Sequence, residues 1–185
     1  MKGIDRYWLL TWTMYGQWLP GDPRGSVTRL ETAGQSHRKE QDEPRSPRTE
    51  SIPELYDSAK SRLRSDPIFL TQPQADLLLT QFKETCDYRK WFLAGTAIMA
   101  NHLHVVLGVP GDPDPEDLLR DLKAYGSRTL NRTYGKQKAG TWWTESGSRR
   151  KLPDSTASDF AINYLRDQEF PLLIWINPIV GTWFS

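Results

Sequence analysis

The stretch that decides the fold is IMANHLHVVLGVP, residues 98–110. Its β-branched and apolar content, bounded by Pro110, predicts one β-strand. Side chains alternate across a strand, so His102 and His104 share one face. The other face carries the apolar side chains Leu103, Val105 and Leu107. We expect the apolar face to pack into the core, and the two imidazoles to stand close enough to bind one divalent ion.

Two imidazoles on one face of a strand allow two interpretations. A metal site that acts on a substrate needs a third ligand and open coordination positions in addition to His102 and His104. The alternative is a pair of histidines that are each hydrogen-bonded to backbone or solvent. The His-x-His spacing alone does not decide between them.

Further strands and helices surround this stretch. Apolar and aromatic runs predict strands over residues 6–14, 91–97 and 141–144, the last continued or answered near 149–152. Apolar residues at helical spacing predict helices over residues 71–88, 116–134 and 157–168. Helices and strands mixed in this order predict an α+β fold around a mainly antiparallel sheet.

We interpret residues 1–185 as a single domain that carries a polar insertion at about 20–67. The insertion loses apolar periodicity and is rich in Arg, Glu, Asp, Ser, Gln and Pro, which is typical of a solvated excursion. A short helix over 52–63 is the element that this stretch favours. His37 lies within the insertion, where we expect it to be exposed and without a role.

Composition excludes several classes of protein. Cys86 is the single cysteine, so neither a disulfide framework nor a cysteine-rich zinc site can form within one chain. No stretch approaches the ~20 apolar residues of a membrane-spanning helix, and no export signal is visible at the start. These features predict a cytoplasmic protein without a membrane partner.

Charge is balanced overall and uneven locally. The net charge is +1, so the whole chain gives no electrostatic argument for a nucleic-acid partner. Residues 120–151, however, carry nine basic and two acidic side chains, with Tyr and Trp between them. Such a composition suits a phosphate backbone and exposed bases. A solvated surface with no ligand is the alternative.

The predicted last helix adds a phenol and an amide. Tyr164 and Gln168 are four residues apart, which places them on one helix face. A phenol is a poor nucleophile near neutrality because its ordinary pKa is about 10. A nearby divalent cation would polarise an attacked phosphate and lower the cost of the charge that forms. The alternative is a half-buried aromatic side chain on an amphipathic helix.

Three segments together resemble a known family. MANHLHVVL, residues 99–107, resembles the M-x-N-H-x-H signature of the single-tyrosine, HUH-type transposases, which include those of small insertion sequences and their REP-associated relatives. Residues 141–152 resemble the Trp-containing strand pair of that family, and residues 163–168 its Y-[IL]-x-x-Q helix. The resemblance spans about residues 6–19 and 68–170. It implies the ferredoxin-like, or RRM-like, architecture of HUH endonucleases.

The resemblance implies a role for each of four residues. His102, His104 and Gln168 would be the ligands of a divalent metal, Mg²⁺ or Mn²⁺, and Tyr164 the nucleophile. The implied reaction nicks single-stranded DNA at hairpin-flanked sites, stores the bond as a 5′-phosphotyrosine and rejoins strands later. That storage needs no ATP, and the chain has no P-loop motif.

The resemblance also implies a DNA interface and a homodimer, because members of that family bind hairpin DNA and are often dimeric. We expect contacts to DNA from six basic residues and two tryptophans, Arg120, Lys123, Arg128, Arg132, Arg149, Arg150, Trp142 and Trp143, although both tryptophans suit the core equally well. Two other functions stay open, a hairpin-DNA-binding protein that does not cleave and a metal-dependent phosphoesterase that uses water. A pure binder would have no use for all four candidate residues.

Overall fold

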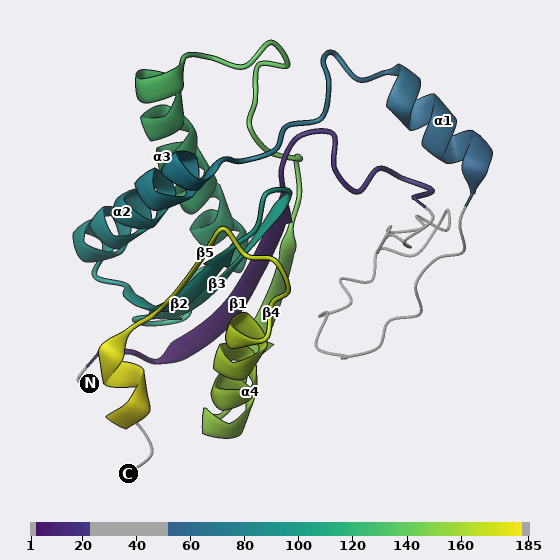
Figure 1. Cartoon of the computed structure of the whole chain (residues 1–185). Coiled ribbons are helices and arrows are strands. Elements are labelled where there is room, and N and C mark those ends of the chain that lie inside the picture. Colours follow the sequence, from purple (N-terminus) through teal and green to yellow (C-terminus); the bar gives the residue numbers. More distant parts are fainter. Residues whose placement is uncertain (1–2, 23–51, 183–185) are drawn as a thin grey trace.

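The computed structural model describes residues 3–22 and 52–182, and one antiparallel sheet organises them (Figure 1). Its strand order is β4-β1-β3-β2-β5. The strands are β1 (Arg6–Thr13), β2 (Phe92–Ile98), β3 (His102–Val109), β4 (Ser148–Leu152) and β5 (Leu173–Ile176). The histidine strand β3 therefore lies at the centre of the sheet, between β1 and β2.

Helices cover both faces of this sheet. The helices of the described residues are α1 (Pro53–Ser61), α2 (Gln72–Arg89), α3 (Pro115–Tyr134) and α4 (Ser155–Arg166), followed by a 3-10 helix, η1 (Pro178–Thr182). Of these, α2, α3 and α4 cover the sheet, and α1 lies apart from it. Figure 1 shows α2 and α3 on one side of the sheet and α4 on the other. The succession β1-α2-β2-β3-α3-β4, with β1 and β3 in the middle, is the ferredoxin-like arrangement. The predicted α+β fold is confirmed.

Two hydrophobic clusters, one on each face, hold the sheet. Leu103, Val105 and Leu107 of β3 pack with α2 and α3, as the sequence predicts. On the other face, Val106 packs with Leu165 and other residues of α4. Because β3 buries apolar side chains on both faces, the face that carries the histidines is part of a core rather than a solvated surface.

Local structure departs from the predicted elements at two strands. The predicted strand 98–110 is divided, since Ile98 ends β2 and Met99 N–H donates to the carbonyl oxygen of His102 to close the turn into β3. Residues 141–144 form no strand; they contribute one bridge, from Trp143 to Met14 at the end of β1. The following strand, β4, is confirmed close to its predicted position.

The sequence prediction missed β5. This strand pairs with β2 through Gly95↔Ile176 and Ala97↔Ile174 and forms an edge of the sheet. Its sequence, LIWI, is apolar and β-prone and lies between Pro171 and Asn177-Pro178. A short apolar run between such breakers is a strand signal, although four residues can equally belong to a loop.

The polar insertion is described only in part. The helix favoured over 52–63 is confirmed as α1, which buries none of its residues. Residues 23–51, with His37, lie outside the described residues. Within the described ranges, no helix is both long enough and apolar enough to span a membrane.

Gly95 allows α4 and β5 to approach the sheet closely. A Cβ at this position would lie 2.8 Å from Ile176 Cδ1 and 3.0 Å from Leu165 Cδ1. The carbonyl oxygen of Trp175 would lie 3.2 Å away. We therefore expect Gly95→Ala to lower the free energy of unfolding by about 1 kcal/mol, because the two side chains must shift and the backbone of β5 must yield slightly. Urea unfolding measures the change. Equal or greater stability in the variant would contradict this packing.

Candidate functional site

The two histidine rings lie side by side where β3 begins. Their centroids are 5.0 Å apart and the ring planes are nearly perpendicular. His104 is 4% exposed, whereas His102 is half-buried at the edge of the site. One face of one strand thus presents two imidazoles together, as the spacing predicts.

Each imidazole is oriented through its Nδ1 atom. His104 Nδ1 lies 2.7 Å from Thr11 Oγ1, and Thr11 is the residue opposite His104 on β1. His102 Nδ1 lies 2.7 Å from Oδ1 of the preceding Asn101. Metal-binding histidines commonly donate their second ring N–H to such an oxygen, which fixes the tautomer and the ring orientation.

Tyr164 approaches this pair from α4. Asp154 caps the helix by accepting a hydrogen bond from Ala157 N–H, and Leu165 anchors the helix in the core. The Tyr164 hydroxyl lies 3.4 Å from His104 Nε2, with ring centroids 5.0 Å apart. The side chain is 46% exposed, so the phenol is accessible to a large substrate.

Gln168 completes the group, although not from the helix on which it was predicted. The helix α4 ends at Arg166, because Asp167 is its C-cap, and Gln168 follows two residues later. Its Nε2 donates to the carbonyl oxygen of Tyr164 at 2.9 Å, and its side chain also hydrogen-bonds His104. The prediction of a continuous helix to Gln168 is wrong, but the four candidate residues converge.

The surroundings of His104 keep its ring neutral. Burial, and after it the neighbouring His102, lower the pKa of His104 to about 3, while the hydrogen bond with Gln168 acts in the opposite direction. The charged imidazolium is disfavoured because it would lose its hydration. A neutral imidazole is the form that binds metal.

The donor set fits a divalent cation. Two imidazole nitrogens and a carboxamide would occupy three positions, which leaves others for substrate oxygens. An amide oxygen and phosphate oxygens favour a hard ion such as Mg²⁺ or Mn²⁺. The described residues contain no cluster of three or more His, Cys, Asp and Glu, so a metal here depends on the amide as third ligand.

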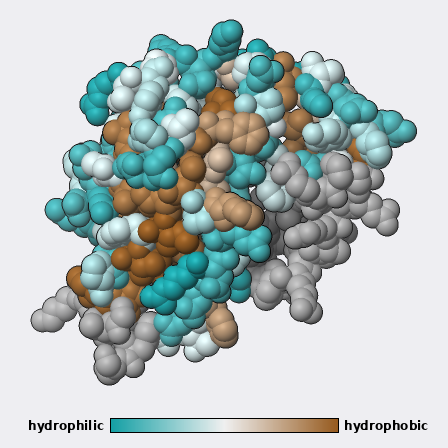
Figure 2. Space-filling model, in the orientation of Figure 1, coloured by the Kyte–Doolittle hydropathy of each residue, from teal (hydrophilic) through white to brown (hydrophobic). Residues whose placement is uncertain are grey.

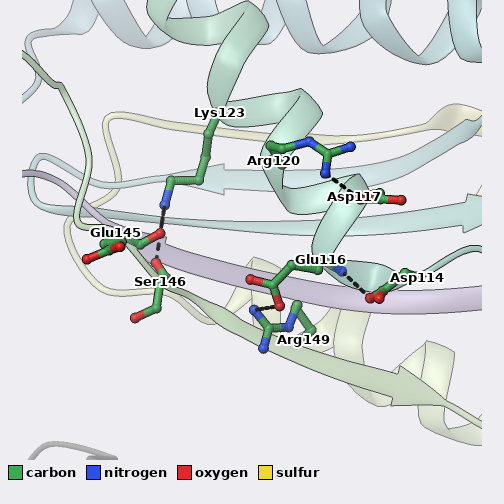
Figure 3. A network of polar contacts seen from close by, with 8 residues as sticks. All are labelled: Asp114, Glu116, Asp117, Arg120, Lys123, Glu145, Ser146 and Arg149. Carbon is green, nitrogen blue, oxygen red and sulfur yellow. Dashed lines mark hydrogen bonds and ion pairs between the residues drawn. The ribbon is translucent and has the colours of Figure 1, made fainter.

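Lys123 corrects the predicted DNA interface. Its side chain is 9% exposed, and Nζ donates to the carbonyl oxygens of Thr144, Glu145 and Ser146 at 2.5, 3.0 and 3.3 Å. Figure 3 shows the ammonium beside Glu145 and Ser146. Burial lowers the pKa of this amine to about 8. All three donors of the ammonium are used, so Lys123 fastens the loop before β4 instead of reaching a phosphate.

Most of the predicted basic residues lie on α3, across the sheet from the histidines. Arg120 pairs with Asp117, and Arg149 of β4 pairs with Glu116, as Figure 3 shows. Arg128 stacks over the ring of Tyr125, and Arg132 donates to Thr129. The structure does not bring these four arginines to the histidines, and any contact that they make with DNA stays a prediction.

Arg150 differs from the other predicted arginines because it shares the histidine face. It pairs with Leu9, whose side chain packs in the α4 cluster, and it is exposed on an edge strand. Ser148, two residues earlier, lies opposite Thr11, the partner of His104. Of the predicted basic side chains, Arg150 is the one whose position suits DNA at the site.

Trp142 and Trp143 belong to the core, which is the alternative that the sequence left open. They are 2% and 4% exposed. Trp142 Nε1 donates to Asn131, and Trp143 Nε1 donates to Ser127 Oγ and to the carbonyl oxygen of Lys123. Neither ring is therefore available as an exposed stacking platform, although Trp143 contributes to the lining of a cavity.

Three residues near the histidines were not singled out from the sequence. Thr11 and Asn101 orient the imidazoles, and the ring of Trp18 lies 6.3 Å from that of His102. Trp18 is 38% exposed and has a φ of 53°, a strained conformation for a bulky side chain. The position of Asn101 next to the histidine motif could have pointed to a role at the site. Nothing in the sequence around Thr11 or Trp18 indicates that they lie near the histidines.

One protein-family model matches this chain. Residues 64–168 match the model of the family described as IS200-like transposases, which is more than half of the chain. A search of curated proteins finds no match.

Two similar solved structures have TM-scores below 0.5. One is a REP-associated tyrosine transposase bound to a REP hairpin (TM-score 0.47, 12% identity); the match covers 89% of this chain and 66% of that one, just under two thirds of its length. The other is a transposase candidate from Deinococcus radiodurans R1 (TM-score 0.42, 14% identity), with 92% and 96% covered. The fold assignment rests on the strands and helices described above.

Burial of His104 makes stability depend on pH. In metal-free protein the unfolded ring takes up a proton near pH 6.5 and the folded ring only near pH 3. The contribution of the neutral ring to the free energy of unfolding is therefore complete above pH 6.5 and is lost as the pH falls from 6.5 to 3. We expect the free energy of unfolding to fall more steeply over that window than in His104→Gln. Urea unfolding in the presence of a chelator measures both slopes, and parallel curves would contradict a depressed pKa.

Lys123→Met tests the internal role of this lysine. Removing the ammonium leaves three carbonyl oxygens without their donor, so the free energy of unfolding should fall by about 1–3 kcal/mol. The salt dependence of DNA binding should not change, because no phosphate contact is lost. Lys90→Met is the exposed control. A smaller salt slope with unchanged stability would restore Lys123 to the DNA interface.

Proposed function

The chain belongs to the IS200-like transposase family, and on that premise we propose that it cuts and rejoins single-stranded DNA with Tyr164 as nucleophile. One observation carries the proposal: the Tyr164 hydroxyl lies 3.4 Å from Nε2 of a neutral, buried His104. Gln168 contacts the same imidazole, and His102 stands beside it. A phenol, two imidazoles and an amide thus meet at one end of the sheet.

The proposed reaction exchanges one phosphodiester for another. The phenolic oxygen of Tyr164 attacks phosphorus, the bond from phosphorus to the 3′ oxygen breaks, and the phenol proton is lost as the leaving 3′ oxygen gains one. The products are a 5′-phosphotyrosine and a free 3′-OH. Attack by a 3′-OH on that link reverses the step and rejoins a strand, so no external energy source is needed.

The electrostatics of the site favour His104 as a metal ligand and not as the base that accepts the phenol proton. A ring whose pKa is about 3 is a poor proton acceptor near neutrality, so His104 is assigned as a ligand rather than a general base. Tyr164 is half exposed, and water can accept the phenol proton. Thr11 keeps the His104 ring in place while the phosphate arrives.

His102, His104 and Gln168 would hold the metal, Mg²⁺ or Mn²⁺. When bound, such an ion polarises the phosphate and lowers the cost of charge on the attacking and leaving oxygens. The protein's own contribution is orientation, because Thr11 and Asn101 fix the rings through Nδ1.

The proposed substrate is single-stranded DNA beside a hairpin, as the family resemblance implies. Arg150 supports this assignment because it is exposed on the face that carries the histidines. A cation there would contact a phosphate near the scissile one, and removing it should weaken binding without selecting among sequences. A cytoplasmic location stays a prediction.

A homodimer is also proposed, and β5 supplies a candidate face for it. Among the described strands, β5 pairs only with β2, and its four residues are half-buried. Figure 2 shows an apolar strip that follows this strand. An apolar edge strand is a ready surface for a second chain.

Tyr164→Phe should abolish the covalent DNA adduct and leave hairpin binding nearly unchanged, because only the phenolic oxygen is removed. Labelled hairpin oligonucleotides are incubated with protein and Mn²⁺, and a protease-sensitive shifted band is sought on a denaturing gel. Tyr88→Phe, an exposed tyrosine on α2, is the matched control and should form the adduct as the unaltered protein does.

Other outcomes of that gel separate the alternatives. An adduct in Tyr164→Phe would overturn the nucleophile assignment. Cleavage without an adduct, retained in Tyr164→Phe, would indicate a phosphoesterase that uses water. Binding without cleavage for every hairpin in the set would indicate a protein that binds DNA and no longer cuts it.

A further inference from the structure

A cavity of about 560 Å³ opens at the end of the sheet, beside the candidate site. Four segments line it: the loop after β1, residues 62–64 after α1, Lys123 of α3, and the loop over residues 139–145. Its volume lies within the range of about 300–1,000 Å³ that is typical of pockets for small ligands. Neither the two histidines nor Tyr164 lines it, so it is distinct from the site described above.

The lining suits a flat group more than a strongly polar one. Leu19, Leu63 and Ala139 contribute apolar surface, and Trp143, otherwise part of the core, contributes to the lining. Polar lining groups are engaged within the protein: Thr144 Oγ1 lies 3.0 Å from Thr13 Oγ1, and the Lys123 ammonium is used by three carbonyl oxygens. The walls can therefore pack against the faces of an aromatic ring.

Two arginines and one acid, Glu145, also line the cavity. Arg62 and Arg64 are exposed, and within the described part of the chain neither guanidinium has a partner. A planar guanidinium with free donors is suited to a phosphate oxygen. Apolar walls next to unpaired arginines match the two parts of a nucleotide, its base and its phosphate.

The cavity borders the candidate site through two connections. Thr144, in its lining, contacts Thr13, and Thr13 is the residue opposite His102 in the sheet. Leu19, also in the lining, follows Trp18, whose ring lies beside that of His102. The cavity and the histidine pair are thus joined through neighbouring residues of β1 and of the loop that follows it.

We propose that this cavity binds an unpaired base of the single DNA strand that is cut, and that Arg62 and Arg64 contact the adjoining phosphates. The inference rests on the proposed function, since it assumes that single-stranded DNA reaches the site. It adds a recognition element that lies outside the metal and nucleophile residues. Stacking of one base contributes about 1–3 kcal/mol to binding.

The test fills the cavity and compares DNA with and without bases. Leu63→Trp is made in the Tyr164→Phe background, and binding of a 20-nucleotide oligothymidylate and of its abasic equivalent is measured by fluorescence anisotropy without metal. We expect Leu63→Trp to weaken oligothymidylate binding about tenfold and to leave abasic binding unchanged. Leu55→Trp, the same change on exposed α1, should leave both affinities unchanged.

A second variant covers the case in which Leu63→Trp is shown by its melting curve to be misfolded. The exposed pair Arg62→Ala and Arg64→Ala should weaken binding of both oligonucleotides and reduce the salt slope by about 1.4, because two phosphate contacts to a single strand are lost. Unchanged affinities in the arginine variant, or an equal loss for both oligonucleotides in a folded Leu63→Trp, would overturn the proposal.

The outcome does not depend on cleavage. If the protein forms a covalent adduct at Tyr164 but the cavity variants bind DNA as tightly as the unaltered protein does, only the proposal for the cavity is wrong. Absence of DNA binding by the unaltered protein would sink both the cavity and the proposed function.

Discussion

The antiparallel register between β1 and β3 is the constraint on which the rest of the site depends. It sets Thr11 opposite His104 and Thr13 opposite His102, and places both imidazoles on the face that α4 covers. Because side chains alternate, a slip of one residue would turn both rings toward α2 and α3. Burial of apolar side chains on that opposite face, Leu10, Trp12, Leu103 and Val105, holds the register.

The same packing gives the candidate metal ligands and the candidate nucleophile different environments. Leu165 fixes α4 against the sheet, and the preceding Tyr164 then reaches the end of β3 with its hydroxyl beside His104. His104 is buried and stays neutral, while Tyr164 remains half exposed. The helix ends two residues before Gln168, and this end lets the amide turn back to the carbonyl oxygen of Tyr164 and to the ring.

Sequence reasoning succeeded where structure is a local property of the chain. Strand alternation placed His102 and His104 on one face. Helical spacing predicted that Tyr164 and Gln168 lie close to each other, and they do, although Gln168 lies beyond the end of α4. It could not find Thr11, which is 93 residues from its partner His104 and is selected by strand pairing. Nor could it show that the Lys123 ammonium donates to carbonyl oxygens of a loop 21–23 residues away. The sequence of a basic stretch is the same whether its amines face solvent or carbonyl oxygens.

The most direct measurement of the central claim is pulsed electron paramagnetic resonance of Mn²⁺ bound to the protein, which detects nitrogen nuclei bonded to the metal. The chain has three histidines, so each can be replaced in turn. Our account predicts two imidazole couplings in the unaltered protein and in His37→Gln, and one fewer in both His102→Gln and His104→Gln. Couplings that survive both of those changes, or their absence from the unaltered protein, would contradict it.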